Sequence, residues 1–210
     1  MLHWLAAARA RLVPPAPRRG AVLVDLGCGG GLLAPHIARK GYLHIGIDLS
    51  LTGPRLASEH GVHAVRADVL RVPLRPECAD VVVAGEILEH VPDLPRAVEQ
   101  ACGLLRPGGL LVIDTLANTA LCRFLAITVA ERLPGVPRGV HEPGLLVDRA
   151  LLVRECARRG VRLRLRGIRP SAADLLGWAL GLRRDVRLRP VPTTAVLFQG
   201  TGTKEARWPR

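Results

Sequence analysis

The sequence predicts an α/β protein with a doubly wound, mostly parallel sheet of seven strands. Short apolar runs bounded by Gly, Asp or Pro alternate with segments whose apolar residues recur at helical spacing. Both faces of the expected strands are apolar, which is typical of parallel strands covered by helices on two sides. The composition, 49% hydrophobic and 23% charged over 210 residues, fits one globular domain and excludes a disordered, collagen-like or coiled-coil chain.

The order of elements follows from this pattern. Strands are expected at residues 21–25, 44–48, 62–67, 79–84 and 110–115, with helices at 32–40, 52–60 and 94–105. Later residues predict a nearly apolar helix at 118–133, a Pro/Gly loop at 134–144, a helix at 148–159, a strand at 161–167, a helix at 171–182 and a strand at 193–199. A short helix is expected at 2–12. The domain plan is therefore an N-terminal helix and linker at 1–20, one domain at 21–203 with a helical insertion at 118–144 after the fifth strand, and a tail at 204–210.

The cysteines and the apolar runs bear on the compartment. Five Cys are an odd number with no C-x-x-C pair, which fits neither a disulfide framework nor a tetrahedral zinc site. No stretch approaches about 18 apolar residues without a charge, so no membrane-spanning helix is expected. The simplest expectation is a reduced chain in the cytoplasm.

The net charge is +12, and 28 of the 30 basic residues are Arg. Such a balance indicates an anionic partner or a coding bias toward Arg. An aromatic content of 3%, with no aromatics interleaved in the basic runs, argues against nucleic acid. Residues 151–190 hold 11 Arg and three acids. This segment is expected to be a solvated face or, alternatively, a peripheral contact with an anionic membrane.

A glycine-rich turn is the most specific signal for function. The run D-L-G-C-G-G-G at residues 25–31 ends an apolar strand and opens into a helix. Glycines let the backbone approach a ligand closely, and the helix start offers unpaired N–H groups. A dinucleotide fingerprint would be G-x-G-x-x-G/A, and it fails because its third glycine position is Leu32. Cys28, inside the turn, is expected to be a small packing residue.

Three aspartates fall at the ends of three successive strands. Asp25, Asp48 and Asp68 are 23 and 20 residues apart, about one strand-helix unit each. Because parallel strands deliver their carboxyl ends to one edge of a sheet, we expect the three carboxylates at the edge where ligands bind. They suit a ribose, an adenine and a cationic amino acid better than they suit phosphates. The alternative is that each Asp only caps the following helix.

Together these residues resemble the class I S-adenosylmethionine-dependent methyltransferases, over roughly residues 20–200. That family has a Rossmann-like sheet of seven strands, the last of them antiparallel. The resemblance implies that the glycines contact the methionine part of the cofactor, that Asp48 holds the ribose hydroxyls and that Asp68 meets the adenine amine. The expected cofactor-binding residues are Asp25, Gly27, Cys28, Gly29, Gly31, Asp48, Leu49, Ala67, Asp68, Val69 and Gly85.

Later segments resemble the ubiquinone-biosynthesis O-methyltransferases within that superfamily. E-I-L-E-H-V at 86–91 is similar to their E-M-L-E-H-V segment, and R-P-G-G at 106–109 to their turn before the fifth strand. T-L-A-N at 115–118, A-I at 126–127, A-E at 130–131 and G-V-H at 139–141 are similar to further landmarks in the same order. Val140 departs from the Thr usual in that family, which also carries a longer N-terminal region.

The E-I-L-E-H segment raises the question of a metal. Glu86, Glu89 and His90 are spaced at i, i+3 and i+4, one face of a helical turn. In the resembling family this set is associated with a divalent metal. The resemblance therefore implies that these residues are ligands of Mg or Zn. The alternative is that they are ordinary residues of the fold and bind no metal.

The expected function is methyl transfer from S-adenosylmethionine to a hydroxyl of a small aromatic, quinol-like or lipid-linked acceptor. His141 is the expected catalytic base, and His90 is its rival. The segment 118–144 is expected to form the wall and cover of the acceptor site. Alternatives are methylation of nitrogen, sulfur or carbon, and a noncatalytic module on the same fold that binds an adenosyl ligand or RNA.

Overall fold

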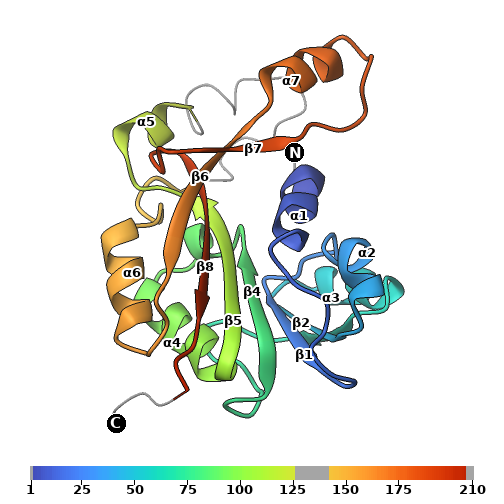
Figure 1. Cartoon of the computed structure of the whole chain (residues 1–210), viewed down its shortest axis with the longest axis vertical. Helices are drawn as coiled ribbons and strands as arrows, with labels where there is room; N and C mark the ends of the chain where they lie inside the picture. The colour runs from blue at the N-terminus through green and yellow to red at the C-terminus, as the bar shows by residue number, and fades with distance from the viewer. Residues whose placement is uncertain (1, 126–141, 207–210) are drawn as a thin grey trace.

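The computed structural model describes residues 2–125 and 142–206, which form one open sheet with helices on both faces (Figure 1). The described strands are β1 (Val22–Leu26), β2 (Leu43–Asp48), β3 (His63–Arg66), β4 (Ala79–Gly85), β5 (Leu105–Leu116), β6 (Arg164–Pro170), β7 (Leu188–Val191) and β8 (Leu197–Thr203). They are ordered β3-β2-β1-β4-β5-β8-β6-β7 across the sheet. The helices are α1 (Leu2–Ala10), α2 (Ala34–Ile37), α3 (Gly53–Glu59), α4 (Leu94–Leu104), α5 (Ala120–Cys122), α6 (Arg149–Ala157) and α7 (Ala172–Ala179), with short 3-10 turns η1 (Ala38–Lys40) and η2 (Leu88–His90).

The direction of the strands fixes where a ligand can bind. β1 pairs in parallel with both β2 and β4, and β4 pairs in parallel with β5. β8 runs antiparallel to both of its neighbours, β5 and β6. The chain moves outward from β1 to β2 and β3, and then returns to add β4 on the other side. In open α/β sheets this reversal opens a crevice at the carboxyl ends of the strands.

Alternation along β4 divides the core into two layers. Every residue of this strand is buried. Val81 and Val83 pack with Leu23 of β1 on the face covered by α1 and α2, whereas Val82 and Ala84 face the cluster formed with α4 and α6. A strand that is apolar on both faces is what the parallel sheet requires, and this confirms the doubly wound α/β class.

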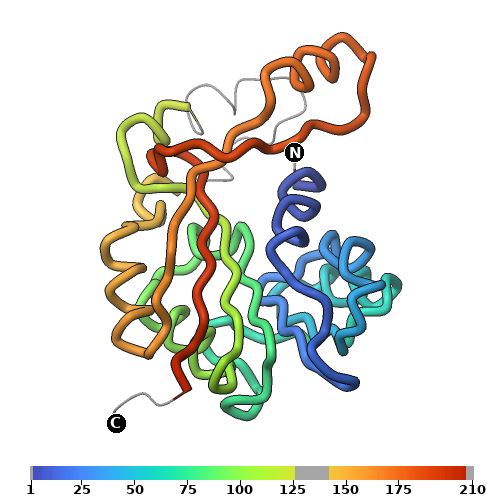
Figure 2. The backbone as a smooth tube through the Cα atoms, viewed as in Figure 1, coloured from blue at the N-terminus to red at the C-terminus, as the bar shows by residue number. Residues whose placement is uncertain are grey.

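The two halves of the chain form the two sides of the sheet. Figure 2 shows the first part, in blue to green, on the side of β1 to β4, and the last part, in orange to red, on the side of β6 to β8.

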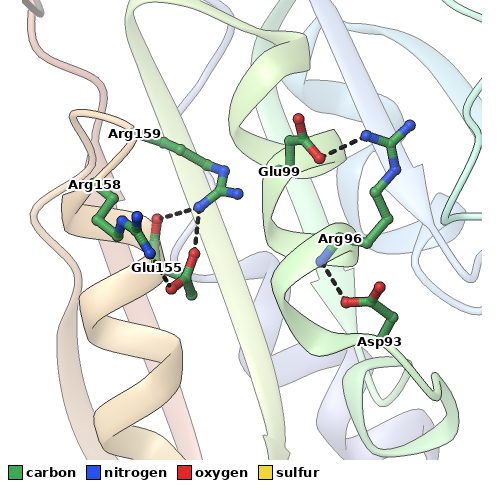
Figure 3. Close-up of polar contacts among 6 residues, drawn as sticks. All are labelled: Asp93, Arg96, Glu99, Glu155, Arg158 and Arg159. Carbon is green, nitrogen blue, oxygen red and sulfur yellow. Dashed lines mark hydrogen bonds and ion pairs between the residues drawn. The ribbon is translucent and has the colours of Figure 1, made fainter.

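Polar contacts hold the ends of α4 and α6. At the start of α4, Asp93 accepts a hydrogen bond of 2.9 Å from the backbone N of Arg96 (Figure 3). On α6, Glu155 accepts from Arg159 at 2.6 Å and from Arg158 at 3.3 Å (Figure 3). No helix in the described residues is long and apolar enough to cross a membrane.

The expected count of seven strands is wrong by one, because β7 adds an eighth at the edge of the sheet. Its sequence, L-R-P-V, has neither an apolar run nor alternation, and Pro190 points to an edge position, where a missing N–H is tolerated. β6 also lies three residues later than expected, since it pairs with β7 through residues 167–170.

The last strand was expected at residues 193–199, but β8 begins at Leu197 and continues to Thr203. Gly200 and Gly202 suggest a strand end, yet here they let neighbouring strands pack closely: a Cβ at Gly200 would lie 2.8 Å from Ile113. β5 likewise begins at Leu105 rather than at 110, with a register shift across the P-G-G turn. Of the expected helix at 118–133, the described part comprises α5 and a helical turn up to Leu125, and residues 126–133 lie outside the described residues.

Candidate active site at the carboxyl end of the sheet

The glycine-rich turn lies at the reversal point of the sheet. The backbone N–H groups of Gly27 and Cys28 donate to the carbonyl of Ile47 in β2, at 2.8 and 3.1 Å. The turn is therefore anchored to the neighbouring strand before the chain enters α2. This leaves its later glycines at the edge where the crevice opens.

Asp48 is tied directly to this turn. One carboxylate oxygen accepts from the backbone N–H of Gly29 at 2.8 Å, and the other accepts from Ser50 at 2.9 Å. Each oxygen has a second lone pair, so the carboxylate remains able to accept from a ligand. The two strongest sequence signals, which are 19 residues apart, thus meet at one place.

Asp25 occupies a different position from the other two aspartates. It is buried, and its Oδ2 lies 3.5 Å from Nε2 of His44, which is buried as well. In the β1–β2 register, Leu23 is opposite His44 and Asp25 is opposite Gly46, so the two polar residues share one face. This approach depends on strand register, which no local sequence pattern shows.

The residues after β3 lie beside Asp48. The backbone N of Ala67 donates to the Asp48 carbonyl at 3.0 Å, whereas Asp68 is exposed and its Oδ1 accepts from Leu70 at 2.8 Å. Val69 is buried, and the Leu49 side chain is 62% exposed. Asp68 therefore stabilises its own turn and keeps an exposed carboxylate, and in the described chain no helix follows it before β4 for it to cap.

Cys28 is a packing residue in this geometry. It is buried, and a Cβ on Gly46 would lie 2.6 Å from its Sγ. Burial, with the nearby charges of Asp25 and Asp48, raises the pKa of the Cys28 thiol to about 12. The thiol is protonated at neutral pH and is no nucleophile.

Glu86, Glu89 and His90 are not on one helical face, so that geometric expectation is wrong. Glu86 has a φ of 52° and precedes η2, so it does not belong to the helical turn. Glu89 is buried and its Oε2 accepts from the Thr115 hydroxyl at 2.6 Å, whereas His90 is exposed. The left-handed backbone at Glu86 breaks the spacing on which the expectation rested.

Arg9 is the functional candidate that sequence reasoning missed. This side chain of α1 enters the carboxyl end of the sheet, where Nε donates to Oδ2 of Asp114 at 2.8 Å and Nη2 donates to Oδ1 at 2.6 Å. Both side chains are buried, at 9% and 0% exposure. Arg9 and Asp114 are 105 residues apart, so no local pattern could have paired them.

Burial of acidic groups beside this ion pair changes their protonation. Burial, followed by the charges of Glu89 and Asp114, raises the pKa of Glu86 well above its ordinary value. Burial also raises the pKa of Glu89 to about 7, although the hydrogen bond from Thr115 acts to lower it. The carboxyl ends of β4 and β5 therefore carry carboxyl groups that hold protons near neutral pH.

The acceptor side is described in part. His141 lies outside the described residues, and so does most of the segment 118–144. A cavity of about 290 Å³ lies where that segment begins, lined by Asn118, Asp148, Arg149, Ala150 and Thr194. It lies next to the end of β5, which is the side of the sheet where an acceptor was expected.

Known proteins share this fold. Residues 24–113, from β1 to β5, match the family described as "Methyltransferase domain". These residues form a methyltransferase domain. The chain superposes on a solved SAM-dependent methyltransferase from Thermotoga maritima with a TM-score of 0.69, at 17% identity, covering 97% of this chain and 89% of that one. That likeness shows the fold.

Curated relatives are similar at higher identity. The ubiquinone biosynthesis O-methyltransferase of Paracidovorax citrulli is 39% identical over 158 residues, which are 70% of this chain and 65% of the relative. The protein of the same name from Methylobacterium nodulans is 38% identical over 135 residues, 61% of this chain and 54% of the relative. The chain thus spans between about half and two thirds of the length of these relatives.

Proposed function

We propose that this methyltransferase domain moves a methyl group from S-adenosylmethionine to a hydroxyl of a small aromatic, quinol-like or lipid-linked acceptor. The observation that carries the proposal is the contact between the glycine turn and Asp48 at the reversal point of the sheet. A turn with close backbone access, next to a carboxylate with free lone pairs, suits the methionine and ribose parts of the donor. The O-methyltransferase names of the relatives support oxygen as the acceptor atom.

Donor binding is tested by calorimetric titration of the full chain with S-adenosylmethionine, S-adenosylhomocysteine and NAD. We expect one site for the two adenosyl ligands and none for NAD, because the third glycine of a dinucleotide fingerprint is Leu32. Binding of NAD without any donor heat would overturn the proposal. Turnover of labelled donor against phenols, catechols, amines and thiols then separates O-methylation from N-, S- or C-methylation, and turnover of none of them favours a noncatalytic adenosyl- or RNA-binding module.

The chain's contribution to the reaction would be to position both substrates and to remove a proton. A donor held between the glycine turn and Asp48 would present its methyl group toward the acceptor side of the sheet, near the end of β5. Leu49, exposed beside Asp48, offers an apolar contact for the adenine ring. The hydroxyl proton leaves as the oxygen attacks, and a neutral imidazole is suited to accept it.

His141→Ala is expected to lower the rate of the methyl-transfer step by about 100-fold or more, with donor affinity nearly unchanged, if His141 is that base. Single-turnover kinetics measures the step, and thermal unfolding shows whether the variant is folded. His36→Ala, a change in an exposed histidine of α2, is the control. An unaltered transfer rate in His141→Ala would give the role to His90 or to water.

We further propose that α7 and the strands beside it contact an anionic membrane. Five large apolar side chains on α7 and the turn after it are 41–77% exposed. They are Leu175, Leu176, Trp178, Leu180 and Leu182. Figure 1 shows α7 and β7 at the end of the molecule beyond the carboxyl end of β5. An exposed apolar helix at that end suits a membrane interface and an acceptor dissolved in it.

The charges around α7 fit an anionic surface. Arg169 and Arg189 are exposed and directly opposite each other on β6 and β7, an arrangement that is unfavourable without a nearby anion. Arg183 and Arg187 pair with buried Asp174, so these two are partly neutralised within the chain. Basic side chains at the rim of an apolar patch are attracted to anionic headgroups.

Replacing Leu176, Leu180 and Leu182 together by Ser is expected to weaken binding to vesicles containing phosphatidylglycerol at least about tenfold, since three apolar side chains lose their burial. Co-sedimentation measures the affinity, and the wild type should bind neutral phosphatidylcholine vesicles more weakly than anionic ones. Leu43→Ser, at an exposed leucine of β2, is the control. Equal binding of both variants and the wild type would contradict membrane contact through α7.

A further inference from the structure

The residues that the family resemblance assigns to a divalent metal do not form a metal site in the described part of the chain. Glu86 lies outside the helical turn with a left-handed φ, Glu89 already accepts the Thr115 hydroxyl, and His90 is exposed. Across residues 2–125 and 142–206, no three His, Cys, Asp or Glu side chains gather in a way that could hold a metal ion. As it is arranged around Arg9, the donor set does not fit Mg or Zn, which need several oxygen or nitrogen ligands around one point.

A different cation lies at this place. The Arg9 guanidinium donates a hydrogen bond to each carboxylate oxygen of Asp114, at 2.6 and 2.8 Å, in a bidentate arrangement. A Cβ on Gly85, at the end of β4, would lie only 1.8 Å from Cζ of Arg9. The guanidinium therefore lies directly on the β4 backbone, in space that is open only because residue 85 has no side chain.

The surrounding charges hold Arg9 in its cationic form. Burial works against the charge, but Asp114, and then Asp25 and Glu86, more than offset it and raise the pKa of Arg9 above its ordinary value. Oε1 of Glu86 and Oε1 of Glu89 are buried without a hydrogen-bond partner. A cluster this rich in carboxyl oxygens needs a positive charge, and Arg9 supplies it.

We propose that Arg9 is the resident cation of this site, a guanidinium supplied by the chain itself at the position where the resembling family is expected to hold a divalent metal. Its planar fork matches the Asp114 carboxylate, and guanidinium stays charged at any pH the protein meets. A divalent ion would have to displace it, because two cations would repel each other within one buried cluster. The site is therefore complete only when α1 packs against the sheet and brings Arg9 to Asp114, whatever the methyl acceptor is.

The test is calorimetric titration of the metal-free full chain with MgCl2, MnCl2 and ZnCl2, alongside thermal unfolding in each metal. We expect no binding at the carboxyl ends of β4 and β5 and no rise in Tm. Arg9→Ala should lower Tm by about 10 °C, because it leaves Asp114 buried and unpaired. Mg2+ or Mn2+ should then bind this variant and restore part of the loss. Arg11→Ala, at an exposed arginine directly after α1, should change neither quantity.

Binding of one metal ion by the wild type that is lost in Glu89→Gln would overturn the proposal. An Arg9→Ala protein with wild-type stability, or with no gain in metal affinity, would overturn it as well. If Arg9→Ala does not fold, Arg9→Lys decides: it keeps the charge without the fork, so it should fold with an intermediate Tm and still exclude the metal. Because these readouts involve no methyl acceptor, their failure is distinguishable from failure of the proposed function.

Discussion

Gly29→Ala is expected to weaken S-adenosylmethionine binding about 100-fold while leaving the protein folded. Gly29 has a φ of +48°, and a Cβ built there meets no atom of the described chain within 4 Å. The added methyl group would therefore project into open space at the ligand edge, where the donor is proposed to lie. The backbone N–H of residue 29 donates to Asp48, and any backbone shift that moves the methyl group away from the donor would disturb this hydrogen bond. Calorimetric titration with the donor measures the effect.

Gly61→Ala is the matched control for this prediction. Gly61 also has a positive φ, +79°, and open space around its Cβ position, but it lies in the turn that leads into the amino end of β3. Both variants should lose about 1 to 2 kcal/mol of stability, since an L residue is strained in the left-handed region. Only Gly29→Ala should lose donor affinity. Equal affinities in the two variants would contradict the placement of the donor along the turn.

The parts of the site that could be predicted from the sequence are those encoded locally. The glycine turn and Asp48 each follow an apolar strand directly, and the parallel sheet brings strand ends together without further information. The strand order places the end of β1 beside the end of β2, and there Gly29 N donates to Asp48 Oδ2 at 2.8 Å. The fold class was predictable for the same reason, because β4 is apolar on both faces.

The parts that were missed depend on contacts between distant segments. Arg9 reads as one of several basic residues near the N-terminus, and only the docking of α1 reveals its partner in β5. The pairing of His44 with Asp25 depends on strand register. The three-residue spacing of Glu86 and Glu89 looked helical because sequence spacing cannot show a single residue in the left-handed region.

Glu89→Gln is expected to remove a loss of folding stability that the wild type undergoes as the pH rises. The ordinary pKa of this glutamate is 4.5, and burial raises it to about 7 in the fold. The folded chain therefore binds this proton more tightly than the unfolded chain, so the contribution of Glu89 is most favourable below pH 4.5 and is lost as the pH rises to 7. Across that interval the loss amounts to about 3 kcal/mol. Gln keeps the shape and can still accept from Thr115, but it does not ionise.

Urea unfolding at about pH 5 and about pH 8 measures this effect. The stability of Glu89→Gln relative to the wild type should rise with pH, whereas Glu99→Gln, which removes an exposed carboxylate paired with Arg96, should leave the pH profile nearly parallel to that of the wild type. The Arg9 charge lowers the pKa of Glu89, so Arg9→Lys in the wild-type background should move the transition only slightly. Parallel profiles for Glu89→Gln and the wild type would mean that Glu89 is ionised throughout, and that the Arg9 guanidinium compensates two carboxylates rather than one.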